Sequence, residues 1–154
     1  MTTQFNHIAI RVADVPAAVE RYRTLYDCRS VYISPIGSEP GCAALCELPG
    51  GTLIELFEAG QGFAGHGCGS LGLIHHALSV DDVDEAFRTA LAAGGMEVRP
   101  PTDNELDLFP GVVFRTAFYR ERDGEVVELM THNWSDALFE QAIPNSPAPT
   151  VGRG

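Results

Sequence analysis

Two segments of the chain share one pattern of apolar and polar positions. Residues 7–15 read His-Ile-Ala-Ile-Arg-Val-Ala-Asp-Val and residues 75–83 read His-His-Ala-Leu-Ser-Val-Asp-Asp-Val. His, Ala, Val, Asp and Val coincide position by position, and both segments are interpreted as strands. An internal repeat of this kind predicts two copies of one structural unit.

An amphipathic helix is predicted after each repeated segment. Apolar residues recur at helical spacing, first at Val15, Ala18, Val19, Tyr22 and Leu25, then at Val83, Ala86, Phe87, Ala90 and Leu91. Asp14 and Asp82 precede these runs, where a carboxylate accepts hydrogen bonds from the unpaired N–H groups of a helix start. The first helix is predicted to end near Tyr26-Asp27 and the second at Gly94-Gly95.

Three strands are predicted after each helix. They lie at about 28–34, 42–48 and 52–58 in the first copy and at about 96–99, 112–120 and 125–131 in the second, with turns at Pro49-Gly50-Gly51 and Asp123-Gly124. The predicted fold class is therefore α+β, with two β-α-β-β-β modules. The modules are expected at 1–58 and 73–132, joined by a Gly-rich connector at 59–72 and followed by a short helix and Pro-rich tail at 133–154.

Composition and charge exclude several classes of protein. The chain has 154 residues, of which 45% are hydrophobic and 20% charged, the balance of an ordinary globular domain. A net charge of -11 argues against binding nucleic acid. All the basic residues are Arg, which excludes chemistry that needs a lysine. With no long apolar run and no signal-peptide pattern at the N-terminus, we expect a cytoplasmic protein.

Polar residues occupy equivalent places in the two copies. His7 and His75 open the first strands, and Glu55 and Glu128 lie inside otherwise apolar last strands. A carboxylate in an apolar strand is costly unless it is paired or binds a metal. The repeat therefore predicts a metal site of two imidazoles and two carboxylates. Taken singly, each residue also fits a structural His or a solvent-facing Glu. His76 is expected on the opposite face of its strand.

The repeated His-x-Ala segment and the strand Glu of each half resemble the vicinal oxygen chelate (glyoxalase/bleomycin resistance/dioxygenase) superfamily, over roughly residues 5–131. In ligand pattern the chain is most similar to glyoxalase I and methylmalonyl-CoA epimerase. This resemblance implies that the modules form a cupped mixed sheet around one divalent metal, with His7, Glu55, His75 and Glu128 as ligands. The chain departs from the family at the end of the first helix, and residues that bind glutathione are not matched. The use of a thiol cofactor stays open.

A metal with these ligands keeps positions for two vicinal oxygens of a small-molecule substrate. The predicted function is a metal-dependent isomerase, epimerase or glyoxalase-type lyase, which moves a proton next to a chelated carbonyl through an enediolate. The resemblance favours Glu128 as the base, with Glu55 as its counterpart. Zn, Ni, Co, Mn and Fe(II) all fit the ligand types. The alternatives are an Fe(II) dioxygenase and a non-catalytic protein that binds an antibiotic or another small molecule.

Two arginines are candidates for binding the substrate. Arg11 lies four residues after His7, which places both on one face of a strand, where a guanidinium holds a carboxylate or phosphate. Its alternative is a pair with a structural acid. Arg115, within an apolar strand, is the second candidate, and loops 34–50 and 100–111 are expected to select the substrate. A homodimer is expected, whether the halves of the cup come from one chain or are exchanged between two.

Overall fold

Each half of the chain forms one β-α-β-β-β module, as the repeat predicts. The computed structural model describes residues 2–35, 42–59, 71–105 and 111–133. The first module contains β1 (Thr3–Val12), α1 (Val15–Tyr26), β2 (Arg29–Pro35), β3 (Cys42–Glu47) and β4 (Leu53–Glu58). The second contains β5 (Gly72–Val80), α2 (Val83–Ala92), β6 (Met96–Glu105), β7 (Val113–Arg120) and β8 (Val126–His132).

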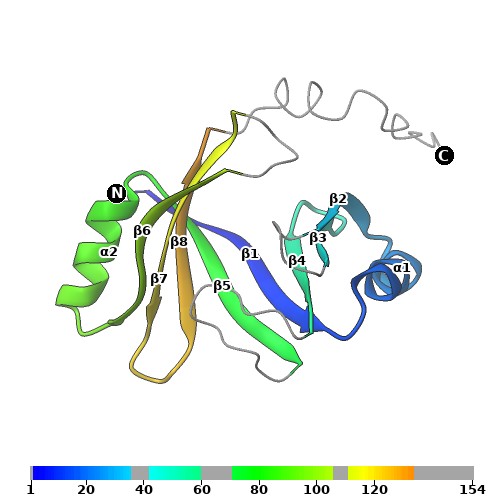
Figure 1. Cartoon of the computed structure of the whole chain (residues 1–154), viewed down its shortest axis with the longest axis horizontal. Helices are drawn as coiled ribbons and strands as arrows, with labels where there is room; N and C mark the ends of the chain where they lie inside the picture. Colours follow the sequence, from blue (N-terminus) through cyan, green and yellow to red (C-terminus); the bar gives the residue numbers. More distant parts are fainter. Residues whose placement is uncertain (1, 36–41, 60–70, 106–110, 134–154) are drawn as a thin grey trace.

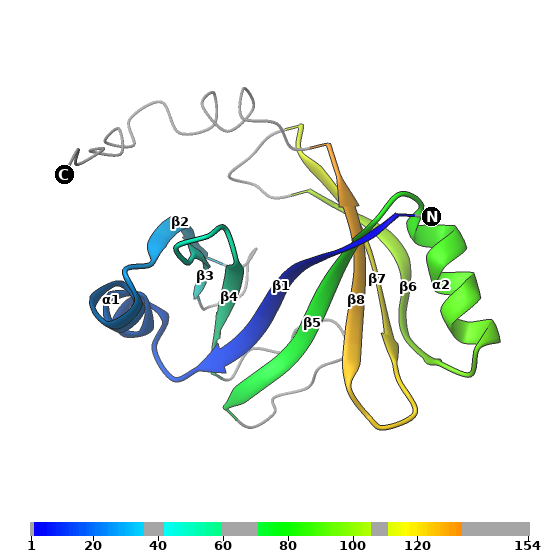
Figure 2. The ribbon, with the colours of Figure 1, turned by 180° about the vertical axis from the view of Figure 1, so that it is seen from behind.

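The two modules share one mixed sheet. Its eight strands run in the order β2-β3-β4-β1-β5-β8-β7-β6. β1 and β5 pair antiparallel at the centre, and each is flanked by the parallel last strand of its own module. The sheet curls, and α1 and α2 lie at its opposite ends (Figures 1 and 2). The α+β class and the paired modules are thus confirmed, and both halves of this sheet belong to one chain.

Both helices begin at the predicted acidic caps. The Asp14 side chain accepts a hydrogen bond from the Ala17 backbone N–H at 2.7 Å, and the Asp82 side chain accepts one from the Glu85 N–H at 3.0 Å. Helix α1 ends where predicted, but its C-cap Asp27 adopts a left-handed backbone conformation with φ 53°. Only glycine adopts such a conformation without a steric penalty.

Strand β6 is longer than predicted. It extends to Glu105 rather than ending at 99, so the first half of the expected loop 100–111 is a strand. Pro100 and Pro101 lie where its pairing with β7 shifts register. Because β6 is an edge strand, its prolines lose few ladder hydrogen bonds. The rest of that loop (106–110), most of the connector (60–70) and the predicted tail helix (134–142) lie outside the described residues.

The helices bury apolar residues against the outer face of the sheet. The cluster beneath α1 includes Val15, Ala18, Val19, Cys28, Ala44, Cys46 and Leu56. The cluster beneath α2 includes Val83, Phe87, Ala117, Tyr119, Val127 and Leu129. Because the outer face holds these apolar clusters, the inner face of the sheet is free to carry polar side chains. Within the described ranges, no helix is long and apolar enough to cross a membrane.

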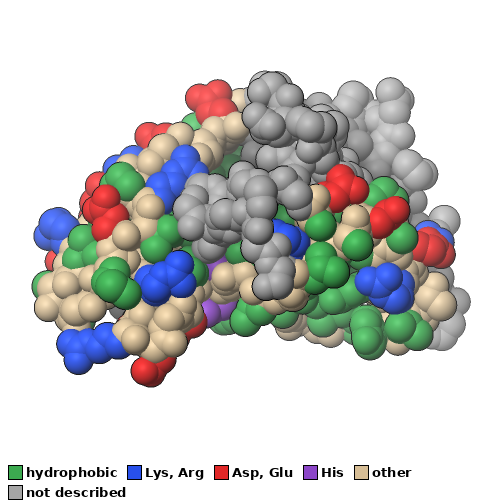
Figure 3. Space-filling model, turned by 60° about the horizontal axis from the view of Figure 1, so that its bottom comes forward, with side chains coloured by type: hydrophobic (Ala, Val, Ile, Leu, Met, Phe, Trp, Pro, Cys, Tyr) green, Lys and Arg blue, Asp and Glu red, His purple; other side chains and the backbone are tan. Residues whose placement is uncertain are grey.

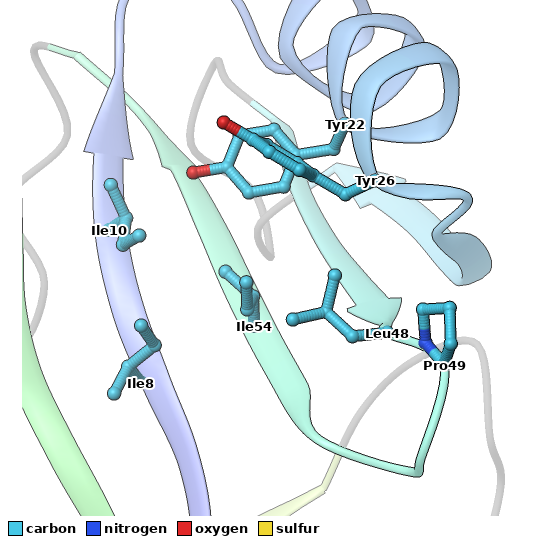
Figure 4. A pocket seen from close by; sticks show the side chains of 7 residues that line it. All are labelled: Ile8, Ile10, Tyr22, Tyr26, Leu48, Pro49 and Ile54. Atoms are coloured by element: carbon cyan, nitrogen blue, oxygen red, sulfur yellow. The ribbon is translucent and has the colours of Figure 1, made fainter.

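Helix α1 covers its half of the sheet incompletely. It packs against β2, β3 and β4 and leaves a cavity of about 490 Å³ beside β1. Ile8, Ile10 and Ile54 face Tyr22 and Tyr26 across this cavity, and Leu48 and Pro49 close one side (Figure 4). Tyr26 is 54% exposed. On the face seen in Figure 3, hydrophobic side chains gather over the half formed by this module. Among the described residues on that face, histidine shows in the hollow between the two halves.

Candidate metal centre

Strand pairing places the four predicted ligands around two alanines. Ala9 on β1 is in register with Glu55 on β4 and with His75 on β5. Ala77 on β5 is in register with His7 on β1 and with Glu128 on β8. Both alanines are 0% exposed. Residues in register point to the same face of a sheet, so the small alanines leave room for the larger side chains to meet above them.

The donor atoms of these four residues converge. His7 Nε2 lies 3.2 Å from Glu55 Oε2 and 3.4 Å from Glu128 Oε2. His75 Nε2 lies 3.1 Å from Glu128 Oε2 and 3.4 Å from His7 Nε2. The ligand atoms of His7, His75 and Glu128 all lie within 4.8 Å of one another, and all three residues are buried. A buried His-His-Glu group of this kind could hold a metal ion, with Glu55 at its edge.

The electrostatics of the group favour a cation. Burial alone would lower the pKa of His7, but its hydrogen bonds to Glu128 and Glu55 outweigh this effect and raise the pKa to about 10. Burial would raise the pKa of Glu128, but its hydrogen bonds to His7 and His75 lower it to about 2. The Glu128 carboxylate thus stays ionised, and a proton on His7 supplies part of the positive charge that it requires. Imidazole nitrogens with carboxylate oxygens are the donors that Zn, Ni, Co, Mn and Fe(II) accept.

Asn6 is a residue of the site that the sequence did not reveal. The pairing of β1 with β5 shifts register between Phe5 and His7, a bulge at Asn6. Asn6 Oδ1 lies 2.8 Å from His7 Nδ1, and Asn6 Nδ2 donates to Ser79 Oγ at 2.8 Å. Asn6 Oδ1 is an acceptor for a proton on His7 Nδ1. With the proton there, Nε2 of His7 faces the other candidate metal-ligating atoms of the site.

The two predicted substrate arginines lie on opposite faces of the sheet. Arg11 is 5% exposed and in register with Phe57, which packs with Ala9 on the inner face. Arg115 does not face the site, contrary to the prediction. Its Nε and Nη2 donate to both carboxylate oxygens of Asp84 at 2.7 and 2.8 Å, and its Nη1 donates to Asp103 at 2.8 Å.

Strand alternation explains the placement of Arg115. Phe118 on β7 faces inward, where its ring centroid lies 5.4 Å from that of His75. Arg115, three positions earlier, therefore points outward, toward α2. His76 is in register with Ile8 and Val127 of the outer face, as predicted.

The fold and this buried group define a class of protein: two paired β-α-β-β-β modules with a candidate metal centre inside the curl of their common sheet. Residues 4–129 match the model of the Glyoxalase/Bleomycin resistance protein/Dioxygenase superfamily, and the chain belongs to that superfamily. The predicted resemblance is thereby confirmed. No curated protein sequence matches the chain.

Solved structures share the fold at low sequence identity. A methylmalonyl-CoA epimerase in complex with methylmalonyl-CoA and NH4+ is 22% identical with a TM-score of 0.66, over 85% of this chain and 95% of that one. The methylmalonyl-CoA epimerase from Mycobacterium tuberculosis is 21% identical with a TM-score of 0.60, over 82% and 85% of the two chains. A mutant of 4-hydroxymandelate synthase from Streptomyces coelicolor is 16% identical with a TM-score of 0.63, over 86% of this chain and 50% of that one.

Proposed function

We propose that the chain is a divalent-metal-dependent isomerase, epimerase or glyoxalase-type lyase, which moves a proton next to a carbonyl of a small molecule with vicinal oxygens. The convergence of two imidazoles and two carboxylates at one buried point carries the proposal. His7, His75 and Glu128 would hold the metal, with Glu55 completing the set. When bound, a divalent metal supplies Lewis-acid polarisation of a substrate carbonyl, which makes the neighbouring C–H acidic.

The two carboxylates differ in their freedom to carry a proton. The Glu128 side chain contacts both imidazoles and is 8% exposed, whereas the Glu55 side chain contacts His7 and is 18% exposed. A carboxylate with fewer partners moves more readily between a metal and a substrate carbon. These contacts favour Glu55 as the base and Glu128 as a fixed ligand, the reverse of the assignment that the sequence favoured.

The test combines metal content with hydrogen exchange. Purified protein should contain about one divalent metal per chain by elemental analysis, and His75→Ala should lose it while Gln4→Ala keeps it. Methylmalonyl-CoA is the first probe, because an epimerase with this fold binds it. With a productive metal, the α-hydrogen of the probe should exchange with deuterated solvent.

Matched variants separate the roles of the carboxylates. Glu55→Gln should retain the metal and lower exchange at least about a hundredfold, the usual contribution of a general base. In Glu128→Gln, by contrast, the first effect should be loss of the metal. If α-hydrogen exchange is near normal in Glu55→Gln but abolished in metal-loaded Glu128→Gln, the role of the base belongs to Glu128. A chain that binds no divalent metal would favour the non-catalytic binding protein.

A second candidate function is an Fe(II) dioxygenase. The tightest group is His7, His75 and Glu128, and two imidazoles with one carboxylate are the ligands of many non-haem Fe(II) oxygenases. Oxygen consumption by Fe(II)-loaded protein, absent with Zn, would favour this function. α-Hydrogen exchange without oxygen consumption would favour the isomerase or lyase.

We further propose that the chain forms a homodimer through the surface around the α1 cavity. Tyr26, Leu25 and Leu73 are 54, 62 and 69% exposed, an apolar surface that a second copy would cover. Proteins with a net charge of -11 repel one another at long range, so an apolar contact must be extensive to hold them together.

A further inference from the structure

A polar group lies on the inner face of the second module, next to the candidate metal centre. Arg99 Nη2 donates to Asn104 Oδ1 at 2.8 Å, and Asn104 Nδ2 donates to Thr116 Oγ1 at 3.0 Å. Thr116 is 7% exposed and in register with Met130 of β8, two residues beyond Glu128. The group therefore borders the metal centre on the β6 side.

A β-bulge turns Arg99 toward the site. Glu97 is in register with Tyr119, whose side chain packs beneath α2 on the outer face. Arg99 is in register with Phe118, whose ring contacts His75 on the inner face. Val98 is the extra residue between these pairs. Bulges are common beside active sites, where they redirect a side chain to the other face.

The backbone of Arg99 lies close enough to the candidate metal ligands for its side chain to contact a molecule bound there. The pairing continues from Arg99 through Phe118 to Glu128, which is two strands away. At about 4.8 Å between neighbouring strands, roughly 10 Å separates the two backbones. Arg99 is half-buried, and its register with Phe118 places it on the same face as Glu128, with Phe118 on the strand between them. A ligand bound at the metal centre can therefore lie over Phe118 and touch Arg99.

The hydrogen bonds of Asn104 fix the position of Arg99 without neutralising it. Asn104 Nδ2 also donates to the carbonyls of Thr102 at 3.1 Å and Phe114 at 3.2 Å, so Oδ1 is the atom left to face Arg99. An amide oxygen carries no net charge. Within the described ranges no carboxylate pairs with Arg99. Arg115, on the outer face of the same hairpin, pairs with two carboxylates.

We propose that Arg99 binds an anionic group of the substrate, a carboxylate or phosphate, while the vicinal oxygens of the same molecule occupy the metal centre. This inference rests on the proposed function and names its substrate class: an oxygen-chelating acid with a second, distal negative charge. A guanidinium held by a neutral partner suits this task, because it offers its remaining N–H groups to an anion in a fixed orientation.

Calorimetry with two probes of equal chain length tests this role of Arg99. The full chain, loaded with Co(II), is titrated with 2-oxopentanoate and with 2-oxoglutarate, which replaces the terminal methyl group with a carboxylate. We expect 2-oxoglutarate to bind at least about tenfold more tightly, the gain of a hydrogen bond to a charged group. A third probe with a distal phosphonate in place of the carboxylate shows which anion the site prefers.

Arg99→Gln should abolish the preference for 2-oxoglutarate and leave the affinity for 2-oxopentanoate within about twofold. Arg99→Lys should retain part of the preference. Arg88→Gln removes the same charge from an exposed position of α2 and should change neither affinity. Thermal melting of the variants checks that each is folded.

The outcomes separate this inference from the proposed function. If Co(II) and 2-oxopentanoate bind but wild type and Arg99→Gln show the same preference between the two acids, the role of Arg99 is refuted and the metal function stands. If neither acid binds because the chain takes up no metal, the proposed function fails and the inference fails with it.

Discussion

His7 lies between two carboxylates, and its charge should influence how the proposed centre takes up a metal. In the metal-free site, the pKa of His7 is raised to about 10, so its proton is retained at a pH where an ordinary imidazole is neutral. A metal that uses Nε2 must displace that proton. Glu128, with its pKa lowered to about 2, has no proton to release at neutral pH.

We therefore expect release of about one proton per metal bound at pH 8. Below about pH 10, the metal affinity should rise about tenfold for each unit by which the pH is raised, because the displaced proton becomes a weaker competitor. Calorimetric titration with Zn in buffers of different ionisation enthalpy measures the release. Zero protons released at pH 8 would show that His7 is already neutral in the empty site.

Asn6 holds the ring of His7, and its removal should weaken metal binding without removing a ligand. Loss of an outer partner of a ligating His usually costs about 10–100-fold in metal affinity, and we expect that range for Asn6→Ala. Competition with a chromogenic chelator measures it. Gln4→Ala, an exposed change on the same strand, is the control. Equal affinities in both variants would contradict a positioning role for Asn6.

At the scale of elements, the alanines in β1 and β5 decide whether the donors can meet. Ala77→Val places two methyl groups between His7 and Glu128, and we expect metal occupancy to fall well below one per chain. Ala117→Val is the matched control, because Ala117 is equally buried but packs beneath α2. It should lower stability by about 1–3 kcal/mol and retain the metal. Full occupancy in Ala77→Val would show that the site tolerates a larger residue there.

The backbone at the end of α1 has an unfavourable conformation, and we expect one substitution to remove its energetic cost. Asp27 is the non-glycine residue with positive φ within the described ranges. Asp27→Gly should raise the free energy of unfolding by about 0.5–1 kcal/mol, because Gly adopts this conformation without a Cβ clash. Thermal unfolding should shift upward by about 2–4 °C per kcal/mol. The same substitution at Thr24, inside the helix, should lower stability by about 0.3–0.5 kcal/mol, because Gly has a lower helix propensity than Thr. A lower melting temperature for Asp27→Gly would refute the penalty.

The sequence predicted the modules and the four converging residues because the repeat relates each His and each Glu to a counterpart. It did not predict the orientation of Arg115. The surrounding residues Val112 to Tyr119 are almost all apolar, and such a run does not reveal which phase of the strand faces inward. The extension of β6 was missed because two prolines normally end a strand that is not at an edge. The bulges at Asn6 and Val98 left no signal in the residue pattern, so the roles of Asn6 and Arg99 required the structure.

At the scale of the whole molecule, the open side of α1 predicts self-association. We expect light scattering at micromolar concentration to give about twice 16.6 kDa. Tyr26→Asp, which places a charge on the cavity, should shift the protein toward the monomer without loss of metal. Thr24→Asp adds the same charge to another exposed position of α1 and should leave the dimer intact. A monomeric wild type that binds metal would show that the apolar surface serves another purpose.

The antiparallel contact between β1 and β5 has a further consequence. His7 and Glu55 belong to the first module and His75 and Glu128 to the second, so the donors divide evenly across that contact. In the proposed metal-bound form, a cation held by all four would act as a reversible cross-link between the halves. Any opening that separates β1 from β5 must first release the cation, so the amide hydrogens of these two strands should exchange no faster than the cation dissociates.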